Sequence, residues 1–344
     1  MAAVCGSFWL EARRQAHNGK MESSMRTTTI HVAIAAAIAT VATFCAMAAE
    51  TGNGLGQKTG EPQSGLRHLK VCRANGGGQP VVDAAPPATN GAFRIMSYNV
   101  RFGKGMDGVR DYRRTARCIL SEGPDYVCVQ EIWNWKEFRR LAGYLGMHGT
   151  FANSRHFLGN AVFSREKPIK CEAVELPYSK KMGRTLVICE YKDFVVASMH
   201  FDLDVNKRKE SVRVVQKALE KYSKPVFIAG DWNNFPKSPV LKGLKKFVKV
   251  VSPEKNVHTY HLRTMKRKEA VIDYIAIDKT HAKDFSVLRS YEVPDRKTSD
   301  HSPIVVELKP AEGRDFISLG ATGSSMYCVK GESEKTLHGS ESGC

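Results

Sequence analysis

Short apolar runs alternate with amphipathic segments between residues 92 and 309 of this 344-residue chain. Runs rich in Val, Ile, Phe and Tyr that are bounded by Gly, Pro, Asn or Asp are typical of strands. On this basis the pattern predicts strands over Phe93–Val100, Tyr126–Gln130, Ala161–Phe163, Thr185–Tyr191, Phe194–Met199, Val226–Ala229, Ala270–Ile277 and Pro303–Leu308.

Apolar residues at helical spacing predict helices between these strands. Tyr112–Leu120 is the first. Asn206 can cap a second helix, and Ser238 followed by Pro239 suits the start of a third. Because some strands follow one another directly while others are separated by helices, we predict an α/β fold. Its two β-sheets should pack face to face and be flanked by helices.

The N-terminal residues 1–49 look like a targeting segment. Residues 30–49 are uncharged and mostly Ala, Ile and Val, with Arg26 before them and Ala46-Met47-Ala48 near their end. A positive flank, an apolar core and a small-x-small site describe a signal peptide, so targeting to the secretory pathway is preferred. A retained membrane anchor through 30–49 is the second interpretation. A mitochondrial or other organellar transit peptide is the third, and two acidic residues argue against it.

Two further segments have compositions unlike that of the central region. Residues 50–91 are rich in Gly, Pro, Gln and Asn and predict a flexible linker, and the Gly- and Ser-rich residues 310–344 predict a disordered tail. The nine cysteines include no C-x-x-C pair, which argues against a structural zinc site. Cys328 and Cys344 could pair in an oxidising compartment.

The composition and the charge of the chain narrow the possible functions further. The chain is 42% hydrophobic and 25% charged, which excludes a fully disordered chain, a collagen and a multi-span membrane protein. Residues 92–309 carry 41 Lys and Arg against 25 Asp and Glu. This excess favours an anionic partner such as nucleic acid, a phosphorylated small molecule or an acidic membrane surface, although solubility alone would also explain it.

Polar residues stand where the predicted strands end: Asn99, Glu131, His200, Asp231 with Asn233, and Asp300 with His301. Asp273 differs, because it lies inside an apolar run, where a carboxylate is costly to bury unless it is paired. By accepting a hydrogen bond from His301, it would fix the tautomer of that ring and leave the other nitrogen free to take a proton. Glu131 and Asp300 supply hard anionic oxygens that suit Mg²⁺.

Six motifs in this order resemble those of the endonuclease/exonuclease/phosphatase superfamily, which has the deoxyribonuclease I-like fold. They are residues 96–101 (MSYNVR), 129–131 (VQE), 198–200 (SMH), 229–233 (AGDWN), 272–275 (IDYI) and 299–303 (SDHSP). The resemblance covers residues 92–309 and nothing outside them. It implies a four-layer α/β sandwich and a divalent-metal-dependent attack of water on phosphorus.

The resemblance also implies roles for the metal ligands and the dyad. Glu131 would be the main ligand of Mg²⁺, or of Mn²⁺, helped by Asn99 and Asp300. His301, oriented by Asp273, would be either the proton acceptor or a stabiliser of phosphate charge.

Further residues are implied around the phosphate. Asp231 and Asn233 would hold the attacking water and a phosphate oxygen, with Asp231 as the alternative base. His200 would contact the phosphate from the other side and can protonate the leaving oxygen. A basic cluster that precedes the Asp273 strand should lie near the rim, where it could follow a phosphate backbone. The expected substrate-binding residues are Arg101, Asn160, Arg263, Lys266, Arg267 and Lys268.

The leading interpretation is a monomeric nuclease acting on DNA or RNA. The alternative is a phosphatase or phospholipase C-like hydrolase of inositol phosphates or phospholipid headgroups, of the sphingomyelinase type. Residues 99–101 (NVR) are more like deoxyribonuclease I, and residues 270–273 (AVID) differ from the Trp-Cys-Asp-Arg run of the inositol 5-phosphatase branch. A catalytically silent binding domain is the third interpretation, and the intact polar set argues against it.

Aromatic residues directly after Glu131 bear on the substrate. Trp133, Trp135 and Phe138, with Arg139 and Arg140, could form a stacking and charged surface for a single strand. The core-facing side of an amphipathic helix explains the same aromatic residues about as well.

Overall fold

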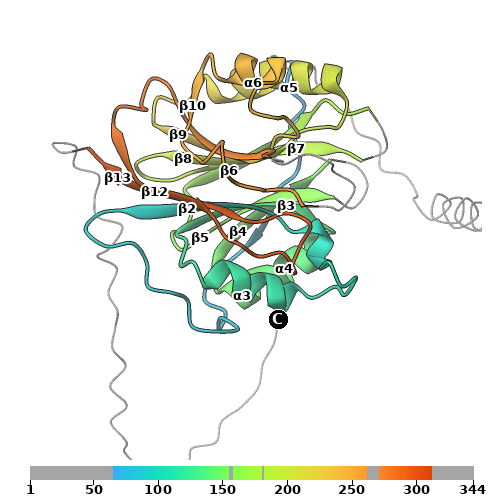
Figure 1. Ribbon diagram of the computed structural model, residues 1–344, viewed down its shortest axis with the longest axis vertical. Coiled ribbons are helices and arrows are strands. Elements are labelled where there is room, and N and C mark those ends of the chain that lie inside the picture. The colour runs from blue at the N-terminus through green and yellow to red at the C-terminus, as the bar shows by residue number, and fades with distance from the viewer. Residues whose placement is uncertain (1–64, 155–157, 180–181, 262–270, 312–344) are drawn as a thin grey trace, which may run out of the picture. The chain divides into compact units, whose positions relative to one another are not determined.

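Two β-sheets lie face to face in the middle of the molecule, and helices cover their outer faces (Figure 1). The computed structural model describes residues 65–154, 158–179, 182–261 and 271–311. The seven-stranded sheet has the order β1 (Cys72–Ala74), β4 (His148–Asn153), β5 (Gly159–Ser164), β3 (Tyr126–Ile132), β2 (Phe93–Asn99), β13 (Ile304–Pro310), β12 (Phe285–Glu292). The six-stranded sheet has the order β10 (Val248–Val250), β11 (Asp273–Asp278), β9 (Val226–Asp231), β8 (Val195–His200), β7 (Arg184–Glu190), β6 (Lys170–Leu176).

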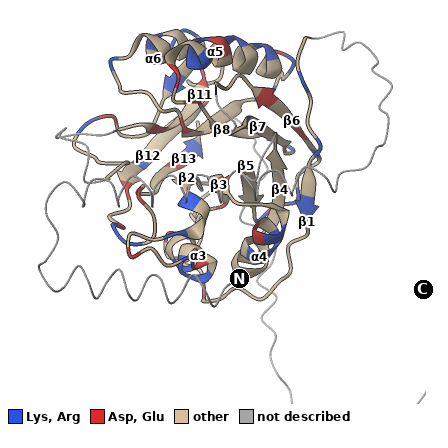
Figure 2. Cartoon of the chain, turned by 90° about the vertical axis from the view of Figure 1, so that its right-hand side faces the viewer, with Lys and Arg blue, Asp and Glu red and all other residues tan. Residues whose placement is uncertain are grey.

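The helices form the two outer layers. On the seven-stranded sheet lie α3 (Tyr112–Leu120) and α4 (Trp135–Leu145), and on the six-stranded sheet lie α5 (Val205–Leu219) and α6 (Pro239–Leu244). Lys and Arg residues occur along the helices of both outer layers (Figure 2). The predicted α/β fold with two packed sheets is confirmed, and its four layers are those of an α/β sandwich.

Aromatic side chains fill the space between the two sheets. The ring of Phe93 on β2 stacks on Phe194, with ring centroids 5.0 Å apart, and meets Phe227 on β9 edge to face at 5.6 Å. Large rings contribute strongly to a core, because each removes a wide apolar area from water. This packing fixes the two sheets against each other, and therefore the distance between their strand ends.

Each sheet contains one parallel pair of strands, β2 with β3 and β8 with β9, while every other neighbouring pair is antiparallel. The first pair is connected through the 3₁₀ helix η1 (Arg101–Gly103) and α3, and the second through α5. The carboxyl ends of two parallel strands lie at the same edge of a sheet. Asn99, Glu131, His200 and Asp231 lie at these ends, so the topology gathers residues that are far apart in sequence.

The cap of helix α5 lies two residues before the predicted one. Asp204, not Asn206, caps the helix, and its carboxylate accepts hydrogen bonds from the backbone N–H groups of Asn206 and Lys207 at 2.8 and 3.1 Å. A carboxylate is a strong N-cap because it also complements the positive end of the helix dipole. The cap of α6 is Ser238 with Pro239 in the first turn, as predicted.

The described part of the predicted linker packs on the fold and adds a strand to the seven-stranded sheet. β1 pairs antiparallel with β4, and Leu66 is buried in the core beneath α5. The linker prediction over 50–91 is therefore wrong for residues 65–91. A strand of three residues has no periodicity that could reveal it.

Several predictions concern residues outside the described ranges. These are the targeting segment 1–49, the tail beyond residue 311, Cys328 and Cys344, and the basic cluster Arg263, Lys266, Arg267 and Lys268. Along the described ranges, every helix is too short or too polar to span a bilayer.

Candidate active site

Three polar residues form a row across the end of the six-stranded sheet. Asp231 at the end of β9 is in register with His200 on the parallel strand β8 and with Asp273 on the antiparallel strand β11. All three side chains are buried. Asp273 was expected inside a strand, but it is the first residue of β11. The row is therefore at the strand ends, where it can face a substrate.

The facing edge of the seven-stranded sheet carries Asn99 and Glu131. Asn99 is in register with Gln130, and the pairing of β3 with β5 then shifts between Val129 and Ile132. Glu131 lies in this irregularity with a φ of 60°. A β-bulge re-aims a side chain, and a positive φ costs about 1–3 kcal/mol for a non-glycine residue. Strain of this kind at a strand end is typical of functional sites.

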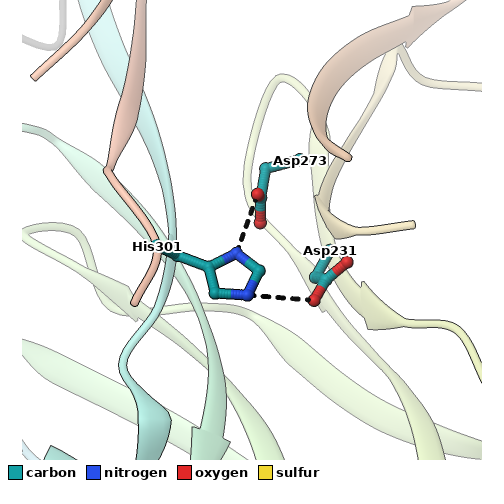
Figure 3. Close-up of side chains that lie close together, drawn as sticks. All are labelled: Asp231, Asp273 and His301. Carbon is teal, nitrogen blue, oxygen red and sulfur yellow. Dashed lines mark hydrogen bonds and ion pairs between the residues drawn. The ribbon is translucent and has the colours of Figure 1, made fainter. Parts of the chain in front are cut away.

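His301 joins the two sheets (Figure 3). It precedes β13, whose first residue Ile304 pairs with Ser97 near the end of β2. Its Nδ1 lies 2.9 Å from Oδ2 of Asp273, and its Nε2 lies 3.7 Å from Oδ2 of Asp231. The predicted contact between Asp273 and His301 is therefore present.

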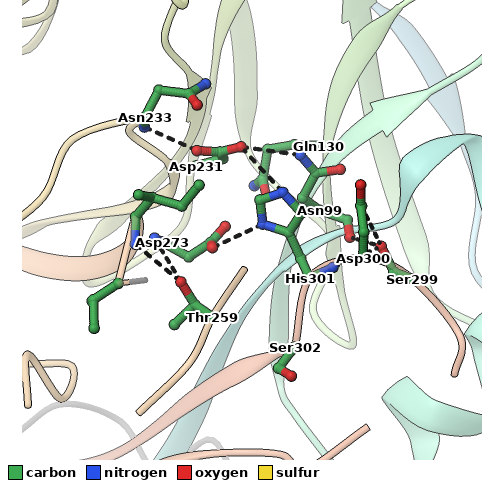
Figure 4. Close-up of polar contacts among 12 residues, drawn as sticks. Asn99, Gln130, Asp231, Asn233, Thr259, Asp273, Ser299, Asp300, His301 and Ser302 are labelled. Atoms are coloured by element: carbon green, nitrogen blue, oxygen red, sulfur yellow. Dashed lines mark hydrogen bonds and ion pairs between the residues drawn. The ribbon is translucent and has the colours of Figure 1, made fainter. Parts of the chain in front are cut away.

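Asp231 is at the centre of the polar contacts (Figure 4). Its Oδ2 accepts a hydrogen bond from Nδ2 of Asn99 at 3.1 Å. The same oxygen lies 3.4 Å from Nε2 of His200. Its Oδ1 accepts from the backbone N–H of Asn233 at 2.9 Å. Asn233 has a φ of 48°, and its own side chain donates to the carbonyl oxygen of Phe201. One carboxylate thus connects the strand ends of both sheets.

Burial and neighbouring charges shift the pKa values of this set. Burial raises the pKa of Asp231 to about 7, and the charge of Asp273 acts in the same direction. Burial lowers the pKa of His301, but the charges of Asp273 and Asp231 outweigh it and raise the value to about 10. Burial holds the pKa of His200 well below its usual range, with help from the positive charge of Arg184. Neighbouring groups therefore favour opposite protonation states at neutral pH, with His301 charged and His200 neutral.

Glu131, Asn99 and Asp300 form a donor set that fits a divalent cation. Burial raises the pKa of Glu131, and the nearby charge of Asp300 raises it further, whereas a hydrogen bond with Asn99 lowers it. Both Asp300 and Asn99 are buried, with exposed fractions of 8% and 1%. The buried Asp300 and the partly buried Glu131 beside an amide oxygen are costly unless a cation compensates their charge, and Mg²⁺ prefers such oxygen ligands. Ligating atoms of Asp231, Asp273 and His301 also lie within 4.8 Å of one another, and within this group Nδ1 of His301 and Oδ2 of Asp273 are paired with each other.

Two of the predicted substrate-binding residues lie in the described region. Arg101 is half-buried with a φ of 45°, and its Nε lies 3.4 Å from Oδ2 of Asp300 at the site. Asn160 is 2% exposed, and its amide donates to the carbonyl oxygen of Thr185 at 2.7 Å. Arg101 therefore lies where a phosphate could be bound, and Asn160 connects β5 to β7.

Four further residues support the site. Thr259, Tyr260 and Arg184 were not singled out from the sequence, and Ser299 stands in the SDHSP motif without a predicted role. The Thr259 hydroxyl accepts the backbone N–H of Asp273 at 3.2 Å, and the Tyr260 ring lies 4.8 Å from that of His301. The Ser299 hydroxyl donates to the carbonyl oxygen of Asn99 at 2.8 Å. Arg184, only 5% exposed, lies close enough to affect the pKa values of both Glu131 and His200. Because these contacts join residues that are distant in sequence, a local sequence pattern does not predict them.

The backbone conformation that places Asp231 at the end of β9 requires a glycine at position 230. The φ of Gly230 is 153°, and a Cβ atom there would collide with the carbonyl oxygen of Met199 on the neighbouring strand. We expect Gly230→Ala to lower the free energy of unfolding by at least about 2 kcal/mol, measured by urea denaturation. Gly143→Ala in α4 is the control, because the added methyl group meets open space and should change stability by less than about 1 kcal/mol. Equal effects of both substitutions would contradict this assignment.

Comparison with known proteins adds a family context. Residues 96–301 match the model of the Endonuclease/Exonuclease/phosphatase family. A search of curated proteins finds no significant match.

Solved structures share the fold. An endonuclease/exonuclease/phosphatase from Beutenbergia cavernae DSM 12333 is 22% identical, with a TM-score of 0.52 over 64% of this chain and 72% of that chain. D. rerio TDP2 complexed with single strand DNA product is 19% identical, with a TM-score of 0.51 over 64% of this chain and 100% of that chain. The human Nocturnin catalytic domain with bound sulfate anion is 18% identical, with a TM-score of 0.50 over 65% and 96% of the two chains.

Proposed function

The chain belongs to the endonuclease/exonuclease/phosphatase family, and from that premise we propose that it is a divalent-metal-dependent nuclease acting on DNA or RNA. Hydrolysis of a phosphoester bond is the activity of the family as a whole. The observation that carries the proposal is the meeting of Asp231, His200 and His301 with Glu131 and Asn99 at one edge of the sandwich.

These residues can perform the separate tasks of hydrolysis. Asp231 can accept a proton from a water molecule, because its carboxylate is central and its pKa is raised to about 7 by burial. His301, kept positively charged by Asp273, can stabilise the negative charge that grows on the phosphate oxygens. His200 approaches Asp231 from the neighbouring strand and can contact the phosphate from that side. In this assignment His301 is the charge stabiliser and Asp231 the base.

The metal would be held by Glu131, Asn99 and Asp300. When bound, a divalent cation supplies Lewis-acid polarisation of the phosphate. Glu131 is aimed at this place by its strained backbone, and Asp300 is held beside it by Arg101. The chain's own contribution is to fix these oxygens before substrate arrives, which reduces the reorganisation that the reaction requires.

Two observations favour a nucleic acid as the substrate. The excess of Lys and Arg in residues 92–309 suits a polymer that carries a charge at every nucleotide. The same fold holds a single strand DNA product in D. rerio TDP2. An anionic membrane would also attract a basic domain, so hydrolysis of phospholipid headgroups is the outcome that the test below must exclude.

Metal removal should abolish the activity. Excess EDTA should lower turnover to background and added Mg²⁺ should restore it, because the carboxylates of Glu131 and Asp300 otherwise repel the phosphate. A rise in the melting temperature of the protein on addition of Mg²⁺, reduced in Glu131→Gln, would report binding independently of turnover. Undiminished activity in excess EDTA would remove this assignment of the metal ligands.

The proposed substrate class is tested by a parallel assay with the purified full-length protein and Mg²⁺. Plasmid DNA, single-stranded RNA, phosphoinositides and sphingomyelin vesicles are offered separately at the same enzyme concentration. We expect cleavage of a nucleic acid and little turnover of the lipids. Fast release of a lipid headgroup with intact nucleic acid would instead identify a phosphatase or a phospholipase C-like enzyme.

A further inference from the structure

Two tryptophans follow Glu131 and remain accessible. Trp133 is half-buried, and Trp135, the first residue of α4, is 56% exposed. Phe138 is fully buried, and its ring stacks on Phe151 in the core at 5.3 Å. The aromatic surface considered from the sequence is therefore limited to the two tryptophans, and Phe138 belongs to the core-facing side of the helix.

Each tryptophan has an arginine over its ring. The guanidinium carbon of Arg139 lies 5.8 Å from the ring centroid of Trp135, and that of Arg110 lies 5.2 Å from the ring of Trp133. Phe102 meets Trp133 edge to face at 5.6 Å. Both arginines are exposed. Aromatic faces combined with cationic groups are what single-stranded nucleic acids bind, because every base has a face that can stack.

This surface continues directly from the proposed metal ligands. Phe102 follows Asn99 by three residues, at a φ of 57°. Trp135 follows Glu131 by four residues, so their Cα atoms are at most about 14 Å apart. An oligonucleotide with its scissile phosphate at Glu131 can therefore reach the ring of Trp135 within a few nucleotides.

We propose that Trp135, backed by Arg139, is a base-stacking subsite that makes single-stranded DNA or RNA the preferred substrate; this rests on the proposed nuclease function. A tryptophan beside arginines can also lie at a membrane surface. However, Lys136, Arg139 and Arg140 beside Trp135 are charged and exposed, so the surface around the tryptophan is mainly charged. The charge of the surface complements a phosphate backbone instead.

The test measures a ratio of two activities. For the full-length protein, kcat/KM is determined on a single-stranded oligonucleotide and on bis(4-nitrophenyl) phosphate, which is too small to reach Trp135. We expect Trp135→Ala to lower the ratio of the two by about tenfold, mostly through KM, since stacking of a base contributes about 1–3 kcal/mol. Trp135→Phe should keep most of the ratio, and Ile169→Ala, at a side chain 64% exposed, should leave it unchanged.

The outcomes separate this inference from the proposed function. A ratio within twofold of the parent value in Trp135→Ala would overturn the subsite while leaving the nuclease proposal intact. A parent protein that hydrolyses the small diester but no oligonucleotide would overturn the proposed function itself. Loss of binding to anionic phospholipid vesicles in Trp135→Ala, with unchanged oligonucleotide cleavage, would assign the tryptophan to a membrane surface and also overturn the subsite.

A separate observation concerns two cysteines of the six-stranded sheet. Cys171 on β6 and Cys189 on β7 are direct partners in the antiparallel register, and both are free thiols. Opposite residues in such a pair have Cα atoms about 4.5–5.5 Å apart, within the range that a disulfide spans. Cys189 is fully buried, whereas Cys171 is partly exposed and its Sγ lies 3.1 Å from the hydroxyl of Thr150.

We infer that Cys171 and Cys189 form a reversible cross-strand disulfide on exposure to a small disulfide such as oxidised glutathione. The Cys171 thiolate attacks one glutathione sulfur and releases one molecule of reduced glutathione. Cys189 then loses its proton, attacks the Cys171 sulfur and releases the second. Hydrogen bonding from Cys189 and Thr150 supports this order, because it lowers the pKa of Cys171 to about 7 although burial opposes it.

Peptide mapping without reductant tests this second inference. The full-length protein is incubated with oxidised glutathione under native conditions, digested and analysed by mass spectrometry. We expect one peptide pair joined through Cys171 and Cys189, lighter by two hydrogen atoms than the separate peptides, and glutathione retained on Cys171 in Cys189→Ser. Glutathione on Cys171 of the parent protein without the cross-link, or two unmodified thiols, would overturn it.

Discussion

Asp231→Asn should lower kcat on a phosphodiester by about 10³-fold or more. The carboxylate of Asp231 is the common partner of Asn99, Asn233 and His200, and it lies 3.7 Å from Nε2 of His301. An amide of the same shape cannot accept the proton of a water molecule, and loss of a positioned proton acceptor costs about 10²–10⁴ in rate. The amide also has a single acceptor oxygen, so it cannot accept from both Nδ2 of Asn99 and the backbone N–H of Asn233, which adds to the effect.

Asp278→Asn is the matched control. Asp278 ends the same strand, β11, that begins at Asp273, and its carboxylate accepts the backbone N–H of Val226 at 2.8 Å, away from the site. This variant should keep its rate within about twofold, because the group is in neither the metal nor the phosphate position. Equal losses in Asp231→Asn and Asp278→Asn would mean that the effect is structural and that Asp231 is not the reacting group.

Asp273→Asn should produce the second largest effect, a fall in kcat of about 10²–10³-fold, because it weakens a positioned charge that stabilises the transition state. Asp273 touches no substrate; it positions His301 through the 2.9 Å contact with Nδ1, and its other oxygen has no hydrogen-bond partner among the described residues. Replacing the carboxylate by an amide removes the charge that keeps His301 positive and changes the partner of Nδ1.

Circular dichroism should show an intact fold in Asp273→Asn, since the backbone N–H of residue 273 still donates to Thr259. The ¹⁵N resonances of the His301 ring provide a readout that a merely structural role would not move. They should show a change at Nδ1 in Asp273→Asn and none in Asp278→Asn. A rate within about threefold of the parent would show that His301 works without this partner.

The polar residues of the site could be predicted because strand ends are visible in sequence. Asn99, Glu131, His200 and Asp231 each follow an apolar run, and two parallel strand pairs bring their carboxyl ends together. Asp273 was identified by the cost of burying a carboxylate, and its contact with His301 is present. These inferences depend on local hydrophobic patterns and on elementary electrostatics, and both can be assessed from the sequence.

Other features depend on contacts that no local pattern contains. Thr259 supports Asp273 from fourteen residues away, and Arg184 reaches the site from the start of β7. The edge strand β12 is exposed at four consecutive residues, 286–289, so buried and exposed positions do not alternate along it as they would in a half-buried strand. Residues 65–91 lack periodicity altogether, and their order comes from packing against β4 and the core beneath α5.

The most direct test of the nuclease assignment is hydrolysis of one oligonucleotide in ¹⁸O-labelled water with Mg²⁺, followed by mass spectrometry of the products. Attack of water on phosphorus at this site predicts shortened oligonucleotides whose new phosphate ends carry one ¹⁸O atom, and no such products from Asp231→Asn. An intact oligonucleotide would contradict the account if, under the same conditions, ¹⁸O enters phosphate released from an inositol phosphate or a phosphorylated headgroup released from a phospholipid.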